Sequence, residues 1–443
     1  MKPIGVLIIG RKRPGFDQEW NAIMRRRAAE ALAEMKLEVV TAAEPVVDDY
    51  TIIAAIEQIT RAGCDSLVVL QPSLGNGQLA FTVMQQWQKP VVLWATPERA
   101  DGPAKASSCS LVATHLWAAM FRQSNRAFEF VYGDPSKDDV RDSLRRALLL
   151  TQVSTELKRT KVGLIGTHAP GFVAMAADAF LLQQSLGVQL HDLSLTQFIE
   201  RARTMDEARV AEDVKEVGKM SLPMDAGVTR DDLALNSRYY LALKDLIAEE
   251  KLDAVALQCW PELSNQVGQW PYLALTRLTS EGIVTSMEGD VDGALTCLLG
   301  KLIDAGGGFV TDWLEHDRES VLFWHGGVAP LEMCRTAKLA KHFNIEKPMV
   351  VDTELKPDLP VTVARLWRCD GKYQLTAFEG RTIPPKRALS GNTGLVKVEG
   401  LNVSKWFDEA LHAGLPHHVV VFGGQHADSF RRLARLLKVA WFE

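Results

Sequence analysis

Residues 4–9, with the sequence IGVLII, begin a pattern that repeats through the first part of the chain. The apolar runs DSLVVL (65–70) and PVVLW (90–94) follow, and segments with helical periodicity lie between the runs, at 18–35 and from Gly77 onward. Short apolar runs that alternate with amphipathic helices are typical of parallel strands joined by helical crossovers. The pattern predicts a Rossmann-like N-terminal α/β domain over residues 1–160.

A second cycle of strands and helices follows a long helical stretch at 137–157. Its apolar segments KVGLIG (161–166) and DAVALQCW (253–260) are separated by helical segments, of which the longest is at 230–250. The same alternation indicates the same architecture. We therefore expect a second Rossmann-like α/β domain over residues 161–345, which also carries the acidic candidate residues discussed below.

The pattern changes near Pro348, where apolar and polar residues alternate between turn residues and Asp370-Gly371 forms a typical hairpin turn. The chain then returns to one helix, a strand, a second helix and a last short strand. The fold expected for the whole chain is α/β, with two Rossmann-like α/β domains followed by a β-rich, barrel-like C-terminal domain over residues 346–443.

The composition is that of an ordinary folded protein, with 47% apolar and 24% charged residues, and 443 residues exceed what one hydrophobic core usually supports. The net charge of -5 and the absence of a long basic run argue against binding to nucleic acid. No stretch approaches the ~18 apolar residues of a membrane span, no signal peptide is recognisable, and the six cysteines include no CxxC pair. We expect a cytoplasmic protein that binds neither nucleic acid nor membranes.

Polar residues follow several of the apolar strands, where parallel sheets collect their ligands. Glu262 follows one strand, Glu288 and Asp290 follow the next, and the pair His417-His418 precedes the strand VVVF. Carboxylates and an imidazole are suitable ligands for Mn²⁺ or Mg²⁺, so these positions predict a divalent-metal site. Asp290 can instead cap the helix that follows it, and only one of two neighbouring strand histidines can face a pocket.

Several segments, taken in order, resemble the L-fucose isomerase and L-arabinose isomerase superfamily. They are GRKRPGFDQEW (10–20), QCWPEL (258–263), LTSEGIVTSMEGDVDGALTCLLGKL (278–302) and PHHVVVF (416–422). The segment WHGG (324–327) resembles the fucose-isomerase-like branch, whose members are less characterised. The superfamily consists of aldose–ketose isomerases that bind Mn²⁺ or a similar cation, and the resemblance implies this activity here.

The resemblance also implies roles for single residues. Glu262 matches a glutamate that is both a metal ligand and a proton-transfer group, and Asp290 matches the aspartate ligand of the fucose-type motif. Glu288 matches the glutamate used on the arabinose side, and His418 matches the histidine ligand. The implied cofactor is Mn²⁺, or alternatively Mg²⁺ or Co²⁺.

The reaction moves a carbonyl between C1 and C2 of a sugar, so a proton must leave one carbon and return to its neighbour. A metal ion makes this easier because it polarises the carbonyl and stabilises the enediolate. Glu262 and Asp290 are expected to act as the base and acid pair. No GxGxxG motif follows the first strand, so no nicotinamide cofactor is expected.

Further residues at strand ends and in loops are candidate substrate contacts. By resemblance, an arginine of the loop after the first strand can reach the active site of a neighbouring subunit, which implies a homo-oligomer with its site near a subunit interface. Two arginines in this loop also suit an anionic substituent such as a sulfonate, so sulfoquinovose is a candidate substrate beside fucose-like hexoses. The candidate substrate contacts are Arg11, Arg13, Gln71, His168, Gln258, Trp260 and His325.

Two alternatives to an isomerase stay open at this stage. Two α/β halves with a cleft between them also describe sugar-binding modules without catalysis, although the chain has many carboxylates for simple sugar binding. A metal-dependent sugar lyase or aldolase would use much the same ligands. Metal-dependent ketose formation, carbon–carbon cleavage, or binding without turnover would distinguish the three.

Overall fold

The structure is a computed structural model that describes residues 3–12 and 15–443. The chain divides into two compact units, which are described separately. Unit 1 comprises Met1–Glu156 with Arg435–Lys438, and unit 2 comprises Leu157–Ala434 with Val439–Glu443. The division into three domains expected from the sequence stays a prediction.

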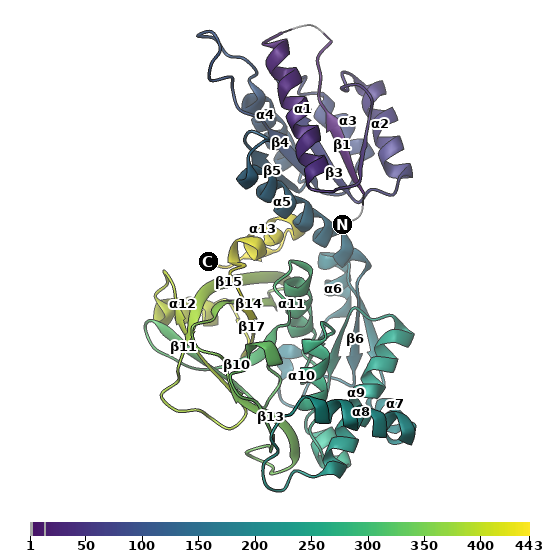
Figure 1. The fold of residues 1–443 in the computed structure, drawn as a ribbon, viewed down its shortest axis with the longest axis vertical. Helices are drawn as coiled ribbons and strands as arrows, with labels where there is room; N and C mark the ends of the chain where they lie inside the picture. Colours follow the sequence, from purple (N-terminus) through teal and green to yellow (C-terminus); the bar gives the residue numbers. More distant parts are fainter. Residues whose placement is uncertain (1–2, 13–14) are drawn as a thin grey trace. The chain divides into compact units, whose positions relative to one another are not determined.

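Unit 1 contains a five-stranded parallel sheet with the order β2-β1-β3-β4-β5 (Figure 1). Leu67 and Val69 of β3 pack with helices α2, α3 and α4, whereas Val68 and Leu70 pack with α1 and α5. Because neighbouring residues of a strand face opposite sides of a sheet, helices cover both faces, which confirms a Rossmann-like architecture for this unit. The elements are β1 Ile4–Ile8, α1 Gln18–Glu34, β2 Val39–Thr41, α2 Asp49–Arg61, β3 Ser66–Gln71, α3 Leu79–Gln86, β4 Val91–Ala95, α4 Ser110–Gln123, β5 Phe128–Tyr132 and α5 Asp138–Glu156.

Unit 2 begins with a four-stranded parallel sheet of the order β7-β6-β8-β9. A capping box formed by Thr229 and Asp232 starts its longest helix, α9, by satisfying free backbone N–H groups. The elements of this part are η1 Leu157–Arg159, β6 Lys161–Ile165, η2 Val173–Met175, α6 Ala179–Leu186, β7 Gln189–Leu193, α7 Leu195–Arg203, α8 Glu207–Lys219, α9 Arg230–Glu250, β8 Ala254–Leu257, η3 Leu263–Val267, α10 Tyr272–Ser280, β9 Val284–Ser286 and α11 Val291–Leu302.

The rest of unit 2 is a nine-stranded, mostly antiparallel sheet with the order β12-β13-β16-β11-β10-β17-β14-β15-β18. An additional pairing between β15 and β16 closes six of these strands into a barrel, as expected for the C-terminal part. The sheet begins at Phe309, earlier than position 346 where the β-rich region was expected. Its elements are β10 Phe309–His316, β11 Ser320–His325, η4 Leu331–Met333, β12 Lys338–Lys341, β13 Pro348–Glu354, β14 Pro360–Cys369, β15 Lys372–Ile383, β16 Asn392–Val398, α12 Val403–His412, β17 His418–Gly423, α13 Ala427–Leu437 and β18 Ala440–Trp441.

Helix α11 joins the two sheets of unit 2. It is apolar on nearly all sides and buried from Val291 to Gly300, because it packs on β8 and β9 of the parallel sheet and on β14 and β17 of the barrel. A side chain at Gly300 would meet the ring of Phe422 at 2.1 Å, so this glycine permits the close approach of β17. Among the described residues, no helix is long and apolar enough to cross a membrane.

Candidate active site

The loop between β9 and α11 carries two of the predicted acidic residues, Glu288 and Asp290. Glu288 and Gly289 adopt left-handed backbone conformations, with φ of 56° and 70°, and such a conformation is uncommon for a glutamate. The loop is held against its neighbours, since the N–H of Gly289 donates to the carbonyl of Leu257 and the N–H of Ala169 donates to that of Glu288. Glu288 is therefore fixed at the carboxyl edge of the parallel sheet.

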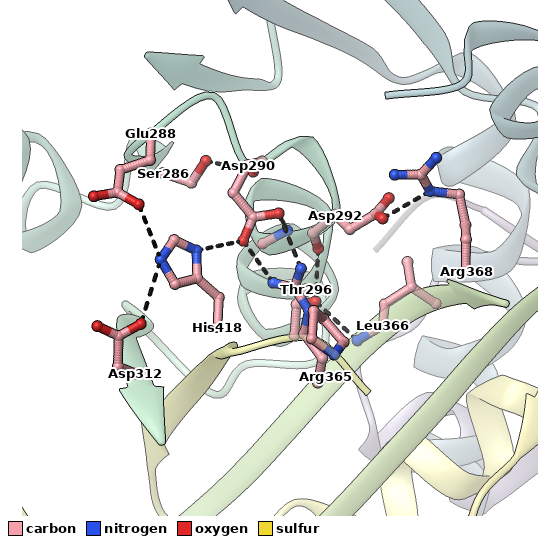
Figure 2. A network of polar contacts seen from close by, with 12 residues as sticks. Ser286, Glu288, Asp290, Asp292, Thr296, Asp312, Arg365, Leu366, Arg368 and His418 are labelled. Carbon is pink, nitrogen blue, oxygen red and sulfur yellow. Dashed lines mark hydrogen bonds and ion pairs between the residues drawn. The ribbon is translucent and has the colours of Figure 1, made fainter. Parts of the chain in front are cut away.

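The barrel brings a second group of polar side chains to the same place. Strands β10 and β17 pair with Asp312 directly opposite His418. The Nε2 atom of His418 lies 3.5 Å from Oε2 of Glu288 and 3.6 Å from Oδ1 of Asp312, as Figure 2 shows. At the end of β11, Nε2 of His325 lies 3.9 Å from Oε1 of Glu288. Side chains from the loop after β9 and from barrel strand β10 thus converge on one imidazole nitrogen.

The chemistry of this cluster fits a divalent cation. Nε2 of His418 and Oδ1 of Asp312 are buried, and neither has a hydrogen-bond partner in the described part of the chain. Ligand atoms of Asp312, His325 and His418 lie within 4.8 Å of one another, as do those of Glu288, His417 and His418. Buried polar atoms need a partner, and a cation bound by carboxylate oxygens and imidazoles would provide it.

Burial and neighbouring charges shift the pKa values of this cluster. Burial raises the pKa of Asp312 to about 6 and lowers the pKa of His325 to about 3 and that of His417 to about 4. Burial also opposes the charge of His418, but the hydrogen bond to Asp290 and the negative charges of Asp290 and Glu288 outweigh it and raise the pKa of His418 to about 10. Burial likewise opposes ionisation of Glu288, yet His418 holds the pKa of this carboxyl below its usual range. The site therefore favours a positive charge among its carboxylates.

Asp290 lies on the other side of the His418 ring from Glu288 (Figure 2). Its Oδ1 accepts hydrogen bonds from the N–H of Gly293 and from Nη2 of Arg365, and its Oδ2 accepts from Nη1 of Arg365 and Nδ1 of His418. The aspartate thus caps helix α11, the alternative considered for it above. Although burial opposes its ionisation, Arg365 holds the pKa of Asp290 well below its usual range. Its assignment as a metal ligand and proton-transfer group stays a prediction.

Glu262 follows β8 and precedes η3. Its side chain is only partly buried, but Oε2 is shielded from solvent and has no hydrogen-bond partner among the described residues. Glu262 belongs to neither of the possible metal-binding groups found in the described part of the chain. Its double role as ligand and proton-transfer group likewise stays a prediction.

The expected substrate contacts in unit 2 occupy different places. Trp260 stacks on Phe172, with ring centroids 6.1 Å apart, and Phe172 lies 4.8 Å from the ring of His417, so an aromatic row leads to the cluster. Gln258 is buried, and its Oε1 accepts a hydrogen bond from the N–H of Thr167, which gives it a place in holding the loop after β6. His168 follows in that loop and is partly buried. The histidine His325 belongs to the cluster itself.

The remaining expected contacts belong to unit 1. Gln71 ends β3 and is fully buried, and neither atom of its amide has a hydrogen-bond partner in the described part of the chain. Arg11 is exposed, with its guanidinium carbon 5.5 Å from the ring centroid of Phe16. Arg13 lies outside the described residues. The roles of all three in substrate binding stay predictions.

Sequence reasoning missed Asp312 and Arg365. Each is a charged residue flanked by apolar residues within a strand, in FVTDWLEH of β10 and in PVTVARLWRC of β14. A charge is rarely buried without a partner or a function. A charged residue among apolar strand residues was therefore the signal that could have singled out Asp312 and Arg365, although it does not identify the partner of either residue.

Comparison with known proteins gives the same relationship as the sequence motifs. Residues 5–108 match the family model of the fucose/sulfoquinovose isomerase N-terminal domain. The sulfoquinovose isomerase of Priestia aryabhattai is 26% identical over 440 residues, which cover 97% of this chain and 96% of the relative, and that of Priestia megaterium (strain ATCC 12872 / QMB1551) gives the same values. The sulfoquinovose isomerase of Alkalicoccus urumqiensis is 25% identical over 387 residues and 85% of each chain. These matches confirm the resemblance to the fucose and sulfoquinovose isomerases that the sequence motifs indicated.

Similarity to solved structures is weak. A periplasmic solute binding protein from Actinobacillus succinogenes 130z, with bound D-allose, is 12% identical and covers 69% of this chain and 92% of its own. The TM-score is 0.19, which is too low to carry an argument about fold or function.

Proposed function

We propose that this chain, an aldose–ketose isomerase related to the fucose and sulfoquinovose isomerases, depends on a divalent cation held by Glu288, Asp312 and His418. The observation that carries the proposal is the convergence of the three side chains, with Nε2 of His418 3.5 Å from Glu288 and 3.6 Å from Asp312. Of the ligands expected from the sequence, the proposal keeps Glu288 and His418. It takes Asp312 in place of Glu262 and Asp290.

The donor set suits Mn²⁺, with Mg²⁺ or Co²⁺ as alternatives, because it combines hard carboxylate oxygens with one imidazole. His325 stands beside Glu288 as a further donor, or as a hydrogen-bonding group for a sugar hydroxyl. When bound, the cation supplies a positive charge that polarises the sugar carbonyl and stabilises the enediolate.

The two carboxylates of the cluster are suited to move the proton between C1 and C2. Glu288, in the loop after β9, and Asp312, in barrel strand β10, flank the same nitrogen of His418. One takes the proton from the carbon next to the carbonyl, and the other protonates the oxygen that loses its double bond, which gives an enediol. The first then returns its proton to the neighbouring carbon, and the second takes the proton of the other hydroxyl as the new carbonyl forms, so both carboxyl groups regain their starting states. Most of Glu288 and Asp312 is shielded from water, which strengthens their electrostatic effect on a bound sugar.

The proposed substrate is a hexose of the fucose type or sulfoquinovose. Similarity over nearly the whole chain to proteins named sulfoquinovose isomerase supports the sulfonated sugar. The row formed by Trp260, Phe172 and His417 offers flat apolar faces to a sugar ring. The proposal further includes contact of Arg11 or Arg13 with the sulfonate. It also includes a homo-oligomer with its active site near a subunit interface, and a cytoplasmic location.

The test uses chelator-treated protein with sulfoquinovose, fucose, arabinose and glucose in D₂O, with and without added Mn²⁺. Proton NMR is expected to show ketose formation from one or more of these sugars, only with the metal, and deuterium at C1 or C2. Ketose formation at full rate in excess chelator would contradict metal dependence. Carbon–carbon cleavage products would identify a lyase or aldolase, and binding without turnover would identify a sugar-binding module.

A further inference from the structure

The pair formed by Asp290 and Arg365 is the most deeply buried ion pair of an arginine or lysine in the described part of unit 2. The two side chains are 0% and 1% exposed, and the guanidinium contacts both carboxylate oxygens, at 2.7 and 3.0 Å. Removing two charges from water costs several kcal/mol per ion, so a buried pair is weak evidence for a role in stability alone. Its position points to a role in the site.

The pair continues directly into the imidazole of His418. Nδ1 of His418 lies 2.9 Å from Oδ2 of Asp290, and because an ionised carboxylate only accepts hydrogen bonds, this nitrogen carries the proton. Nε2 faces Glu288 and Asp312, as Figure 2 shows, and presents its lone pair to that side once the imidazole is neutral, as a metal ligand must be. A carboxylate that fixes the tautomer and orientation of a histidine in this way is the usual support of a metal-binding imidazole.

The same pair connects the two parts of unit 2 that supply the cluster. Asp290 and Glu288 lie in the loop before α11, whereas Asp312 and His418 lie on barrel strands. Arg365 comes from β14 of the barrel and holds Asp290 at the first turn of α11. Its contact therefore keeps the acidic loop in register with the barrel.

We propose that Asp290 is a positioning residue, clamped by Arg365, which fixes the His418 imidazole so that Nε2 faces Glu288 and Asp312. The inference rests on the proposed function, because it assumes that His418 holds the cation. It assigns Asp290 a role beside the cation site and not within it. The clamp acts through His418 and touches no reacting atom.

A second buried pair between the same helix and the same strand provides a matched control. Nε of Arg368 lies 2.8 Å from Oδ2 of Asp292, and the hydroxyl of Tyr373 donates to Oδ1 of this aspartate. Asp292 is 4% exposed and follows Asp290 by two residues, but it has no contact with His418 among the described interactions. Loss of this pair changes the junction without changing the histidine.

The test measures the Kd for Mn²⁺ from the electron paramagnetic resonance signal of the free ion, which requires no turnover. We expect Asp290→Asn to weaken Mn²⁺ binding by about 10- to 100-fold, and Arg365→Lys, which keeps the charge but loses the two-pronged contact, to weaken it by about tenfold. Asp292→Asn is expected to leave the Kd unchanged. Circular dichroism establishes that each variant is folded, and if Asp290→Asn fails to fold, Arg365→Lys decides.

The outcomes separate this inference from the function on which it rests. Wild-type affinity in folded Asp290→Asn or Arg365→Lys would overturn the inference, and so would an equal loss of affinity in Asp292→Asn. If the wild-type protein itself binds no Mn²⁺ in this titration, the proposed metal dependence fails and the positioning role fails with it.

Discussion

Replacing Gly289 with alanine is expected to displace Glu288 and to lower kcat/KM by about 100-fold. A Cβ atom at this position would lie 2.2 Å from the carbonyl oxygen of Thr167 and 2.8 Å from Cα of His168, and both contacts are with backbone that cannot rotate away. Restoring the first distance to 3.0 Å, below which real Cβ atoms essentially never approach other atoms, requires a movement of 0.8 Å. Misplacement of a catalytic group by about 1 Å costs about 100-fold in rate.

The left-handed backbone at Gly289, with φ of 70°, adds about 1–2 kcal/mol of strain to the alanine variant. Gly282→Ala is the matched control, because Gly282 has φ of 77° but no atom within 4 Å of its added Cβ. The assay is ketose formation followed by NMR, with thermal unfolding of both variants. Wild-type activity in Gly289→Ala, or an equal loss of activity in Gly282→Ala, would refute the claim that the close fit of this loop positions Glu288.

Three further predictions concern single carboxylates. Glu288→Gln and Asp312→Asn should each lower kcat by about 10²- to 10⁴-fold in steady-state kinetics. A larger loss of kcat in Glu262→Gln would instead support Glu262 as the proton-transfer group, as expected from the sequence. In metal-free protein, burial raises the pKa of Asp312 to about 6, so its contribution to stability is present below pH 3.8 and is lost as the pH rises through 6. Asp312→Asn should therefore raise the free energy of unfolding by up to about 3 kcal/mol at neutral pH in chelator. A variant that unfolds at lower urea concentration than wild type would contradict this. In unit 1, burial opposes ionisation of Glu98, but hydrogen bonds from Ser107 and neighbouring groups lower its pKa to about 2. After allowance for the exposure of this side chain, Glu98→Gln should lower the free energy of unfolding by about 1 kcal/mol above pH 4.5. If the loss of stability relative to wild type does not shrink as the pH falls toward 2, these hydrogen bonds are not its origin.

The parallel sheets could be predicted from the sequence because each strand carries its own signal. The run at Ser66–Gln71 is buried along its whole length, as continuous apolar runs between helices indicate. Strands β10 and β11 were not assigned to the barrel, because their partners β17 and β16 lie far along the chain, Asp312 opposite His418 and His325 opposite Asn392. Such pairing depends on long-range register, for which a local pattern gives no information.

The candidate site could be predicted in part for the same reason. Glu288 and His418 stand at the end and the beginning of recognisable strands, where ligands collect. Asp312 lies within β10 and reaches the site only because β10 pairs with β17, opposite His418. The place of Asp290 depends on Arg365, a buried partner on β14 that no motif near the aspartate reveals.

The position of the bound cation decides whether Glu288, Asp312 and His418 hold it. Crystals grown with Mn²⁺ and measured on both sides of the manganese absorption edge give an anomalous difference peak wherever the ion binds. The account predicts one peak in unit 2, with carboxylate oxygens of Glu288 and Asp312 and Nε2 of His418 at about 2.0–2.4 Å. A peak coordinated by Glu262 or Asp290, or no peak in unit 2 at saturating Mn²⁺, would contradict it.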